Sequence, residues 1–121
     1  MLVSELTAGK QLDSLVALAQ GWTLWAEGVP YSTWSEFDAT PYQPSTNGAQ
    51  AFELLKENSR IALFTSQNNV DALYYDNNGN HHFKTFHYKT NSEISEAICK
   101  AFLVGEFEGD EIPDEIMARV E

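Results

Sequence analysis

The stretch "DALYYDNNGNHHFKTFHY", residues 71–88, decides the fold of this 121-residue chain. Its centre, "DNNGN" at 76–80, contains the two residue types, Asn and Gly, that tolerate the positive φ angles of tight hairpin turns. Aromatic and apolar residues stand on both sides, as is typical of strands. We therefore expect an antiparallel hairpin with strands at about Ala72–Tyr75 and His81–Tyr88.

The segments before this hairpin predict one more strand and a helix. "RIALFTSQ" (60–67) has a β-favouring composition, and "GAQAFELLKENS" (48–59) is typical of an amphipathic helix that begins near Asn47. Further upstream, "WTLWAEGVPYSTWSEFDA" (22–39) places Gly28 and Pro30 between aromatic residues, which indicates one or two short strands around a turn.

The chain is expected to begin and end with helices. In "AGKQLDSLVALAQGW" (8–22) apolar residues recur at helical spacing, Ser4 and Thr7 offer caps, and Gly21 offers a stop. Thr90 and Glu93 fit a capping box before an apolar repeat that runs from Ile94 to Phe102. After Gly105 the chain turns acidic, and Pro113 fits the first turn of a short terminal helix.

This order, α–β–β–α–β–β–β–α with a short terminal helix, predicts one α+β domain over residues 1–121, with helices packed on a mostly antiparallel sheet. A parallel doubly wound sheet would need a regular strand–helix alternation, which this order lacks. If strand residues alternate, some of the aromatic residues must face outward; the candidates are Trp25, Tyr31, Trp34, Tyr42, Tyr75 and Tyr88. The oligomeric state stays open, although small sandwiches with exposed aromatic residues often pair as homodimers.

The net charge of −11, from 18 acidic and 7 basic residues, disfavours direct binding to nucleic acid. It suits a basic protein partner, a protein that imitates DNA, or solubility alone. The N-terminus lacks the pattern of a secretory signal, and no apolar run approaches the length of a membrane span. We therefore expect a cytoplasmic protein.

Metal and catalytic sites are not indicated. The single cysteine, Cys99, excludes a thiolate cluster and falls in a helical pattern, where a partly buried, unreactive thiol is expected. In a strand, His81 and His87 would lie about 20 Å apart with His82 on the other face, so the three could not share a zinc ion. The phosphate-binding and nucleophile-elbow glycine motifs are missing, so we expect no metal, no cofactor and no assigned catalytic residue.

Three phrases resemble small bacteriophage and prophage proteins of the phage ABA-sandwich domain family. They are "SELT" before the first helix, "YQPSTNG" at 42–48, and "GDEIPDEI" at 109–116. In this chain Gly48 stands where the family often has tryptophan, and "AQAFEL" replaces its common Gly-Gly-Pro. The resemblance implies a three-layer helix–sheet–helix sandwich and a phage protein in the bacterial cytoplasm. Because such small proteins often neutralise host defences, it also implies a role in host-defence evasion.

The loop "PYQPSTNGAQAF", residues 41–52, is the candidate ligand site. Its polar groups can cap the helix that follows, and the same amides and hydroxyls could bind a nucleotide-type signal or another small ligand. In that hypothesis Tyr42 or Trp34 would stack on the ligand and Arg60 would offset its charge. The candidate ligand-binding residues are Trp34, Tyr42, Ser45, Thr46, Asn47, Gln50 and Arg60.

Two alternatives remain. The first is a protein–protein inhibitor or DNA mimic that binds a host protein through the acidic segment Glu106 to Glu115. The second is a small enzyme with a nonstandard site, for which the sequence offers no candidate base. We regard an enzyme as less favoured than a binding protein.

Overall fold

The structure is a computed structural model, in which residues 1–24, 30–31 and 42–120 are described. The helices are α1 (Lys10–Ala19), α2 (Gly48–Glu57), α3 (Ile94–Phe107) and α4 (Asp114–Met117). The strands are β1 (Thr23–Leu24), β2 (Pro30–Tyr31), β3 (Ile61–Phe64), β4 (Asn69–Tyr75) and β5 (His81–His87). Short 3₁₀ turns lie at Val3–Glu5, Thr65–Gln67 and Asn91–Glu93. The order of helices and strands is the one predicted from the sequence.

Strands β3, β4 and β5 form an antiparallel sheet in that order, and β1 and β2 form a separate antiparallel pair. The β4–β5 hairpin pairs Tyr75 with His81 around the "DNNGN" turn. In this turn the Asp76 carboxylate accepts hydrogen bonds from the backbone N–H groups of Asn78 and Asn80, at 2.9 and 3.0 Å. Gly79 has a φ of 84°, so the predicted positive-φ turn is confirmed.

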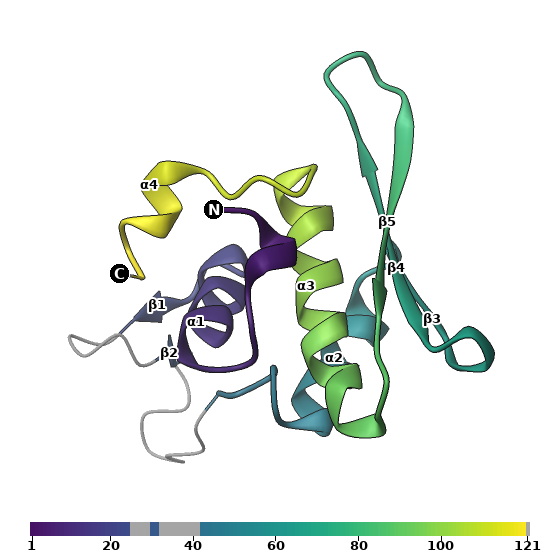
Figure 1. The fold of residues 1–121 in the computed structure, drawn as a ribbon. Coiled ribbons are helices and arrows are strands. Elements are labelled where there is room, and N and C mark those ends of the chain that lie inside the picture. Colours follow the sequence, from purple (N-terminus) through teal and green to yellow (C-terminus); the bar gives the residue numbers. More distant parts are fainter. Residues whose placement is uncertain (25–29, 32–41, 121) are drawn as a thin grey trace.

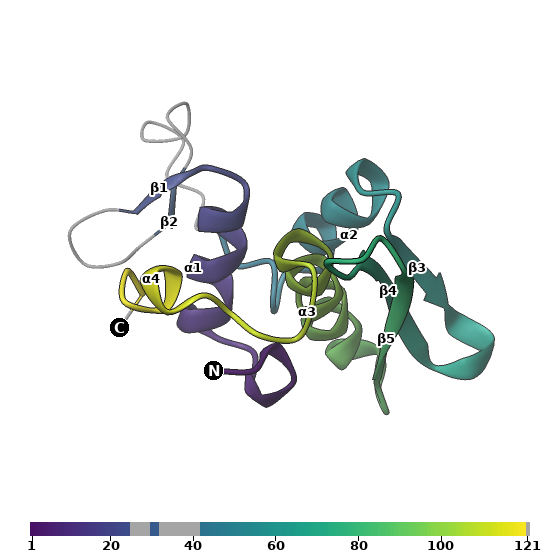
Figure 2. The same ribbon diagram turned by 90° about the horizontal axis from the view of Figure 1, so that it is seen from above.

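The expected α+β sandwich with an antiparallel sheet is confirmed (Figures 1 and 2). Helix α3 lies against the sheet with α2 beside it, and α1 packs on the opposite side of α3. The β1–β2 pair and α4 lie beyond α3 from the sheet, next to α1. Among the described residues, both helical layers therefore stand on one face of the three-stranded sheet, which we call its inner face. The layer order differs from the helix–sheet–helix order that the resemblance implied, because α1 packs on α3 and not on the sheet.

Helix α3 forms the centre of the core because it has neighbours on two sides. Its buried residues include Ile98, Cys99, Leu103 and Val104, each with no exposed surface. From α1 the core receives Leu12, Leu15 and Val16, and from the sheet it receives Val70, Ala72 and Phe86. The thiol of Cys99 is more deeply buried than expected, and this burial raises its pKa well above the usual value. Cys99 is therefore a core residue with an unreactive thiol.

The predicted start of the first helix was wrong, whereas its predicted end is confirmed. The helix begins at Lys10, after Gly9, and Ser4 instead donates from its N–H and hydroxyl to Asp110 at 2.9 and 2.8 Å. At the other end Gly21 has a φ of 82°. The N–H groups of Gly21 and Trp22 donate to the carbonyls of Leu18 and Ala17, the paired arrangement of a Schellman motif.

At the last long helix the predicted capping box does not form. The Thr90 hydroxyl donates to the Glu93 carboxylate at 3.1 Å rather than accepting from a backbone N–H, and a 3₁₀ turn precedes α3. The helix continues past Gly105 to Phe107. The short terminal helix follows Pro113 as expected.

The first residues of the chain are paired with the segment before α4. The Val3 N–H donates to the Asp110 carbonyl at 2.7 Å, and the Ile112 N–H donates to the Met1 carbonyl at 3.0 Å. Leu2 and Glu111 form an antiparallel bridge between these bonds. Within the described ranges, no helix is long and apolar enough to cross a membrane.

Candidate functional site

The predicted ligand loop is held by internal hydrogen bonds at Ser45. Ser45 is 1% exposed, and its N–H donates to the Asp13 carboxylate of α1 at 2.8 Å. Its hydroxyl accepts from the Gly9 N–H at 3.0 Å. Asp13 is itself buried, and this burial raises its carboxyl pKa even though the bonds from Ser45 act in the opposite direction. Ser45 therefore joins the loop to the start of α1.

The next polar residues of the loop stabilise its turn and the start of α2. The Asn47 side chain accepts from the Gln50 N–H at 3.2 Å, so the predicted helix cap is present. The Gln50 side chain accepts from the Gln43 N–H at 2.6 Å. Thr46 donates its hydroxyl to the Gln43 carbonyl at 3.4 Å. These contacts account for the geometry of the turn without a ligand, and whether Ser45, Thr46, Asn47 or Gln50 also binds one stays a prediction.

Tyr42 lies apart from the rest of the loop, against the end of α1. Its ring packs on Trp22 with the centroids 4.3 Å apart, and its hydroxyl accepts from the Gln20 side-chain amide at 2.7 Å. Burial raises the pKa of Tyr42 to about 12, so the hydroxyl stays protonated at neutral pH. Trp34, the other predicted stacking residue, lies outside the described residues.

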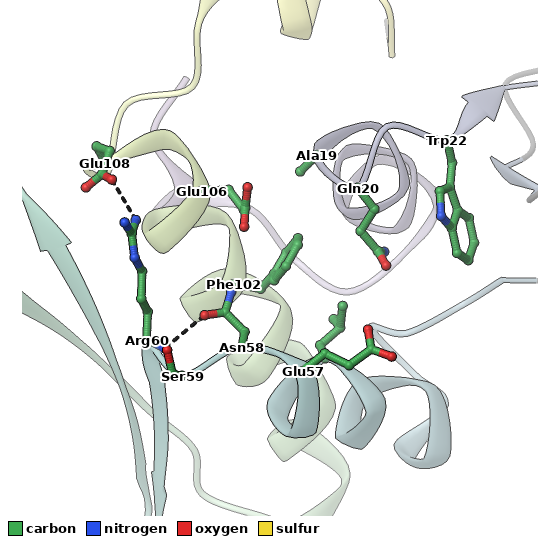
Figure 3. Close-up of a pocket in the computed structure, with 11 residues that line it drawn as sticks. Ala19, Gln20, Trp22, Glu57, Asn58, Ser59, Arg60, Phe102, Glu106 and Glu108 are labelled. Carbon is green, nitrogen blue, oxygen red and sulfur yellow. Dashed lines mark hydrogen bonds and ion pairs between the residues drawn. The ribbon is translucent and has the colours of Figure 1, made fainter.

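A cleft of about 730 Å³ lies beside Trp22 (Figure 3). The carboxyl ends of three helices meet there. α1 supplies Ala19, and Gln20 and Trp22 come just after it. α2 supplies Glu57, with Asn58 after it, and α3 supplies Glu106. The remaining lining residues are Leu54, Ser59, Arg60, Phe102 and Glu108. The cleft therefore has a partly apolar wall and a polar rim.

The electrostatics of the cleft favour positive charge. Each helix ends with a partial negative charge from its aligned peptide dipoles, and three such ends converge here. The lining carries the carboxylates of Glu57, Glu106 and Glu108 against the single guanidinium of Arg60, a formal charge of −2.

Arg60 is already engaged on one edge of the cleft. Its Nη1 donates to Glu108 Oε1 at 2.6 Å and to the Gly105 carbonyl at 2.8 Å. The second oxygen of Glu108 accepts from the Tyr75 N–H at 2.7 Å. These bonds, that of Tyr75 first and then that of Arg60, lower the pKa of Glu108, so this carboxyl is ionised at neutral pH.

The structure thus divides the predicted site. Arg60 lines the cleft and Tyr42 contacts two of its lining residues, whereas Ser45, Thr46, Asn47 and Gln50 are not among its lining residues. Sequence reasoning missed Gln20, Trp22 and Glu57, and it assigned Glu106 and Glu108 to the acidic protein-binding segment rather than to this cleft. Most of these stand in the last turn of a helix or just after it. The helix stops were therefore the available signal, although the stops do not reveal that the three ends converge.

The three histidines lie on β5, where the His82 ring and the Asp76 carboxylate are hydrogen-bonded at 2.9 Å. Residues 1–24, 30–31 and 42–120 contain no group of three or more histidine, cysteine or acidic side chains arranged to hold a metal ion.

Comparisons with protein-family models, with curated proteins and with solved structures give no match for this chain.

Proposed function

We propose that this protein is a small binding protein whose ligand site is the cleft at the carboxyl ends of α1, α2 and α3. The observation that carries the proposal is the convergence of three helix ends and three glutamates on one cleft beside the Trp22 ring. This combination favours an organic cation, such as an alkylammonium group with an apolar chain. It disfavours the nucleotide-type ligand expected from the loop.

The shape and lining of the cleft support a small ligand. Its volume of about 730 Å³ lies in the range of small-molecule sites. Leu54 and Phe102 form the floor of the cleft and are almost fully buried, while Glu57 and Glu106 are exposed and can contact a charged end. The face of an indole such as that of Trp22 attracts cations.

The positive charge of Arg60 does not make the cleft favour anions over cations. A nucleotide phosphate would have to compete with Glu108 for the guanidinium, because these two side chains already form an ion pair at 2.6 Å. The phosphate would also meet the carboxylates of Glu57 and Glu106. Like charges brought together in a partly desolvated site raise the free energy of binding.

The biological setting is part of the proposal and rests on the resemblance of three short phrases to phage proteins. In this setting the protein is made from a phage or prophage gene in the bacterial cytoplasm. It would act against host defence by sequestering a small molecule. The cleft would then serve as the sequestering site.

Isothermal titration calorimetry with two probes tests the ligand class. Spermidine, a polyamine cation, is expected to bind with a Kd of roughly 10 µM to 1 mM, as weak ion pairs and one cation–π contact allow. Sodium chloride at high concentration should weaken this binding. AMP should show no binding under the same conditions. Tight AMP binding together with no spermidine binding would favour the nucleotide-type ligand instead.

Substitution of two glutamates that line the cleft tests whether spermidine binds there. The double variant Glu57→Gln, Glu106→Gln should weaken spermidine binding about tenfold, since it removes two lining carboxylates. Glu53→Gln is the matched control: Glu53 lies on the same helix as Glu57, is exposed, and is not among the lining residues of the cleft. Because the control removes one charge and the double variant removes two, a loss of binding free energy in Glu53→Gln of about half that in the double variant would indicate a nonspecific effect of net charge. Mass spectrometry of small molecules released by heating the purified protein would then identify the natural ligand.

A second candidate function is an acidic inhibitor of a host protein. It is favoured by the exposed carboxylates of Glu106, Glu111, Asp114 and Glu115, for which the described residues show no ion pair. The two other acids of this segment are engaged, Glu108 with Arg60 and Asp110 with Ser4. Charge reversal at Glu111, Asp114 and Glu115 would abolish binding to such a partner and leave spermidine binding unchanged.

A further inference from the structure

The outer face of the three-stranded sheet, opposite α3, exposes a group of apolar side chains. Phe83 is 64% exposed, and Phe64 and Tyr75 are each 42% exposed. In the register of the sheet Leu73 pairs with Phe83 and Tyr75 pairs with His81, so these side chains are neighbours across β4 and β5. Side chains on successive strand positions alternate between faces, and the inner face holds the buried Val70, Ala72 and Phe86 instead.

Aromatic contacts join β4 and β5 at the hairpin end of this face. The rings of Tyr75 and His81 meet edge to face at 6.3 Å, and those of His81 and Phe83 meet in the same way at 6.0 Å. The Arg60 guanidinium lies over the Tyr75 ring at 5.7 Å. Leu73, Tyr75 and Phe83 are therefore contiguous, whereas Phe64 stands apart from them, beside Asn69 at the other end of β4. Contiguous exposed apolar groups mark interaction surfaces.

The charge of the chain is unevenly distributed between the sheet and the rest of the molecule. Residues 60–89 contain three basic residues, Arg60, Lys84 and Lys89, and two acidic residues, Asp71 and Asp76, which leaves a formal charge of +1. All other residues together carry −12. Lys84 stands on the inner face, because it pairs with the buried Ala72. The strand residues of the outer face therefore carry one formal charge, that of Asp71, whose carboxylate accepts from the Thr85 hydroxyl at 2.7 Å.

The uneven charge distribution indicates which class of partner the outer face of the sheet can bind. A basic protein would be attracted to the acidic helical side, and an acidic or nucleic-acid partner would need more basic groups than the histidines that β5 places on this face. Two copies of this chain repel each other wherever their acidic surfaces meet. They can approach with less of that repulsion through the outer faces of their sheets, where the strands carry one carboxylate per copy, and apolar side chains meet there.

We infer that the protein forms a homodimer in which the outer faces of two sheets pack against each other. Sheets in proteins pack face to face at about 10 Å, with the side chains of the two faces interdigitating. Phe83 and Leu73 stand on neighbouring strands of the sheet and form the centre of this contact, with Phe64 and Tyr75 around it. The dimer is a four-layer assembly of helices, sheet, sheet and helices.

The size of the face sets the expected affinity. β4 and β5 have seven residues each and are about 24 Å long, and β3 has four residues and is about 14 Å long. At a strand spacing of about 4.8 Å they give a footprint of roughly 300 Å² per copy. A standard interface buries about 800 Å² per partner. The dimer is therefore weak, with a Kd on the order of 100 µM.

Sedimentation velocity from 10 µM to 1 mM tests the inference on the full chain. The wild-type protein should shift from monomer to dimer across this range, and Phe83→Ser should raise the Kd at least tenfold. Phe83 is mostly exposed, so its replacement should leave the urea unfolding midpoint nearly unchanged. Phe64→Ser, on the far strand of the same face, should also weaken the dimer.

Phe52→Ser is the matched control. Phe52 is 42% exposed, like Phe64, but lies on α2 away from the outer face, so its replacement should leave the dimer intact. A wild-type protein that stays monomeric at 1 mM would overturn the inference. So would a dimer that is equally strong in Phe83→Ser. Binding of single-stranded oligo(dT) by the monomer, lost in Phe83→Ser, would assign the face to nucleic acid and would also overturn it.

Discussion

The Asp13 carboxylate of α1 accepts a hydrogen bond from the backbone N–H of Ser45, and this 2.8 Å contact joins the first helix to the loop that starts the second. Both residues are buried, at 4% and 1% exposure. A buried N–H without a partner is unfavourable by a few kcal/mol, so Asp13 has a structural role that its charge alone would not suggest.

Replacing Asp13 tests this role. Asp13→Ala should lower the free energy of unfolding by about 2 to 3 kcal/mol, because it leaves the Ser45 N–H without an acceptor. Asp13→Asn keeps an acceptor oxygen and should lose less. Urea denaturation followed by far-UV circular dichroism measures both values. If Asp13→Ala unfolded at the same urea concentration as the wild type, the bond would contribute nothing.

The hairpin turn predicts a specific acid response. The bond from His82 and those from the N–H groups of Asn80 and Asn78 lower the pKa of Asp76 from 3.8 to about 2. A lowered folded-state pKa means that Asp76 stabilises the folded state above pH 3.8, and this contribution is lost as the pH falls toward 2.

A ¹³C NMR titration of the Asp76 carboxyl measures this pKa directly. His82→Gln should raise it toward the ordinary value, since the His82 bond is the largest cause of the shift. His87→Gln is the control, because His87 lies at the other end of β5, where it pairs with Asn69. An Asp76 pKa near 3.8 in the wild type would contradict the described turn.

Replacing the helix cap Asn47 tests whether the ligand binds to the loop or to the cleft. Asn47→Ala should destabilise the protein by about 1 kcal/mol, the usual effect of removing a helix N-cap, and Asn47→Asp should retain most of the stability. Because Asn47 is not among the residues that line the cleft, spermidine binding to folded Asn47→Ala should be unchanged. A loss of ligand binding in this variant, with the fold intact, would indicate that the ligand binds to the loop and not to the cleft.

Alanine substitutions at Gly21 and Gly48 compare a glycine with a positive φ angle and a glycine in a helix. Gly21 has a φ of 82°, and no atom lies within 4 Å of the position that an alanine Cβ would occupy there. Gly21→Ala therefore meets backbone strain alone and should be destabilising by about 1 kcal/mol. Gly48 begins α2, and the nearest neighbour of an added Cβ would be 3.9 Å away, so Gly48→Ala should be neutral or slightly stabilising. Thermal unfolding of both variants checks the contrast, and equal midpoints would argue against the left-handed conformation of Gly21.

Local features of the structure were predictable from the sequence wherever the physical cause was local. The Gly21 stop, the Asn47 cap and the "DNNGN" turn each depend on residues within a few positions, and each is present. The predicted Thr90 capping box does not form, because the Thr90 hydroxyl donates to the Glu93 side chain instead of accepting from a backbone N–H. A motif of four residues does not determine which of these bonds forms.

Long-range partners were not predictable in the same way. Ser4 bonds to Asp110, and Ser45 bonds to Asp13, across 106 and 32 positions of the chain. The cleft likewise depends on Trp22, Glu57 and Glu106, which come together only when three helices pack. The separation of charge between residues 60–89 and the rest is present in the sequence, but its meaning depends on the sheet being one face of the molecule.

That separation of charge gives the molecule a large electric dipole along the direction from the helices to the sheet. On a positively charged surface a single copy should therefore adsorb through its helical side and present Phe83 outward. In a dimer joined through the sheets, the two dipoles point in opposite directions and largely cancel, and both ends of the particle are acidic. Such a particle repels its own kind at every remaining surface, so assembly stops at two copies.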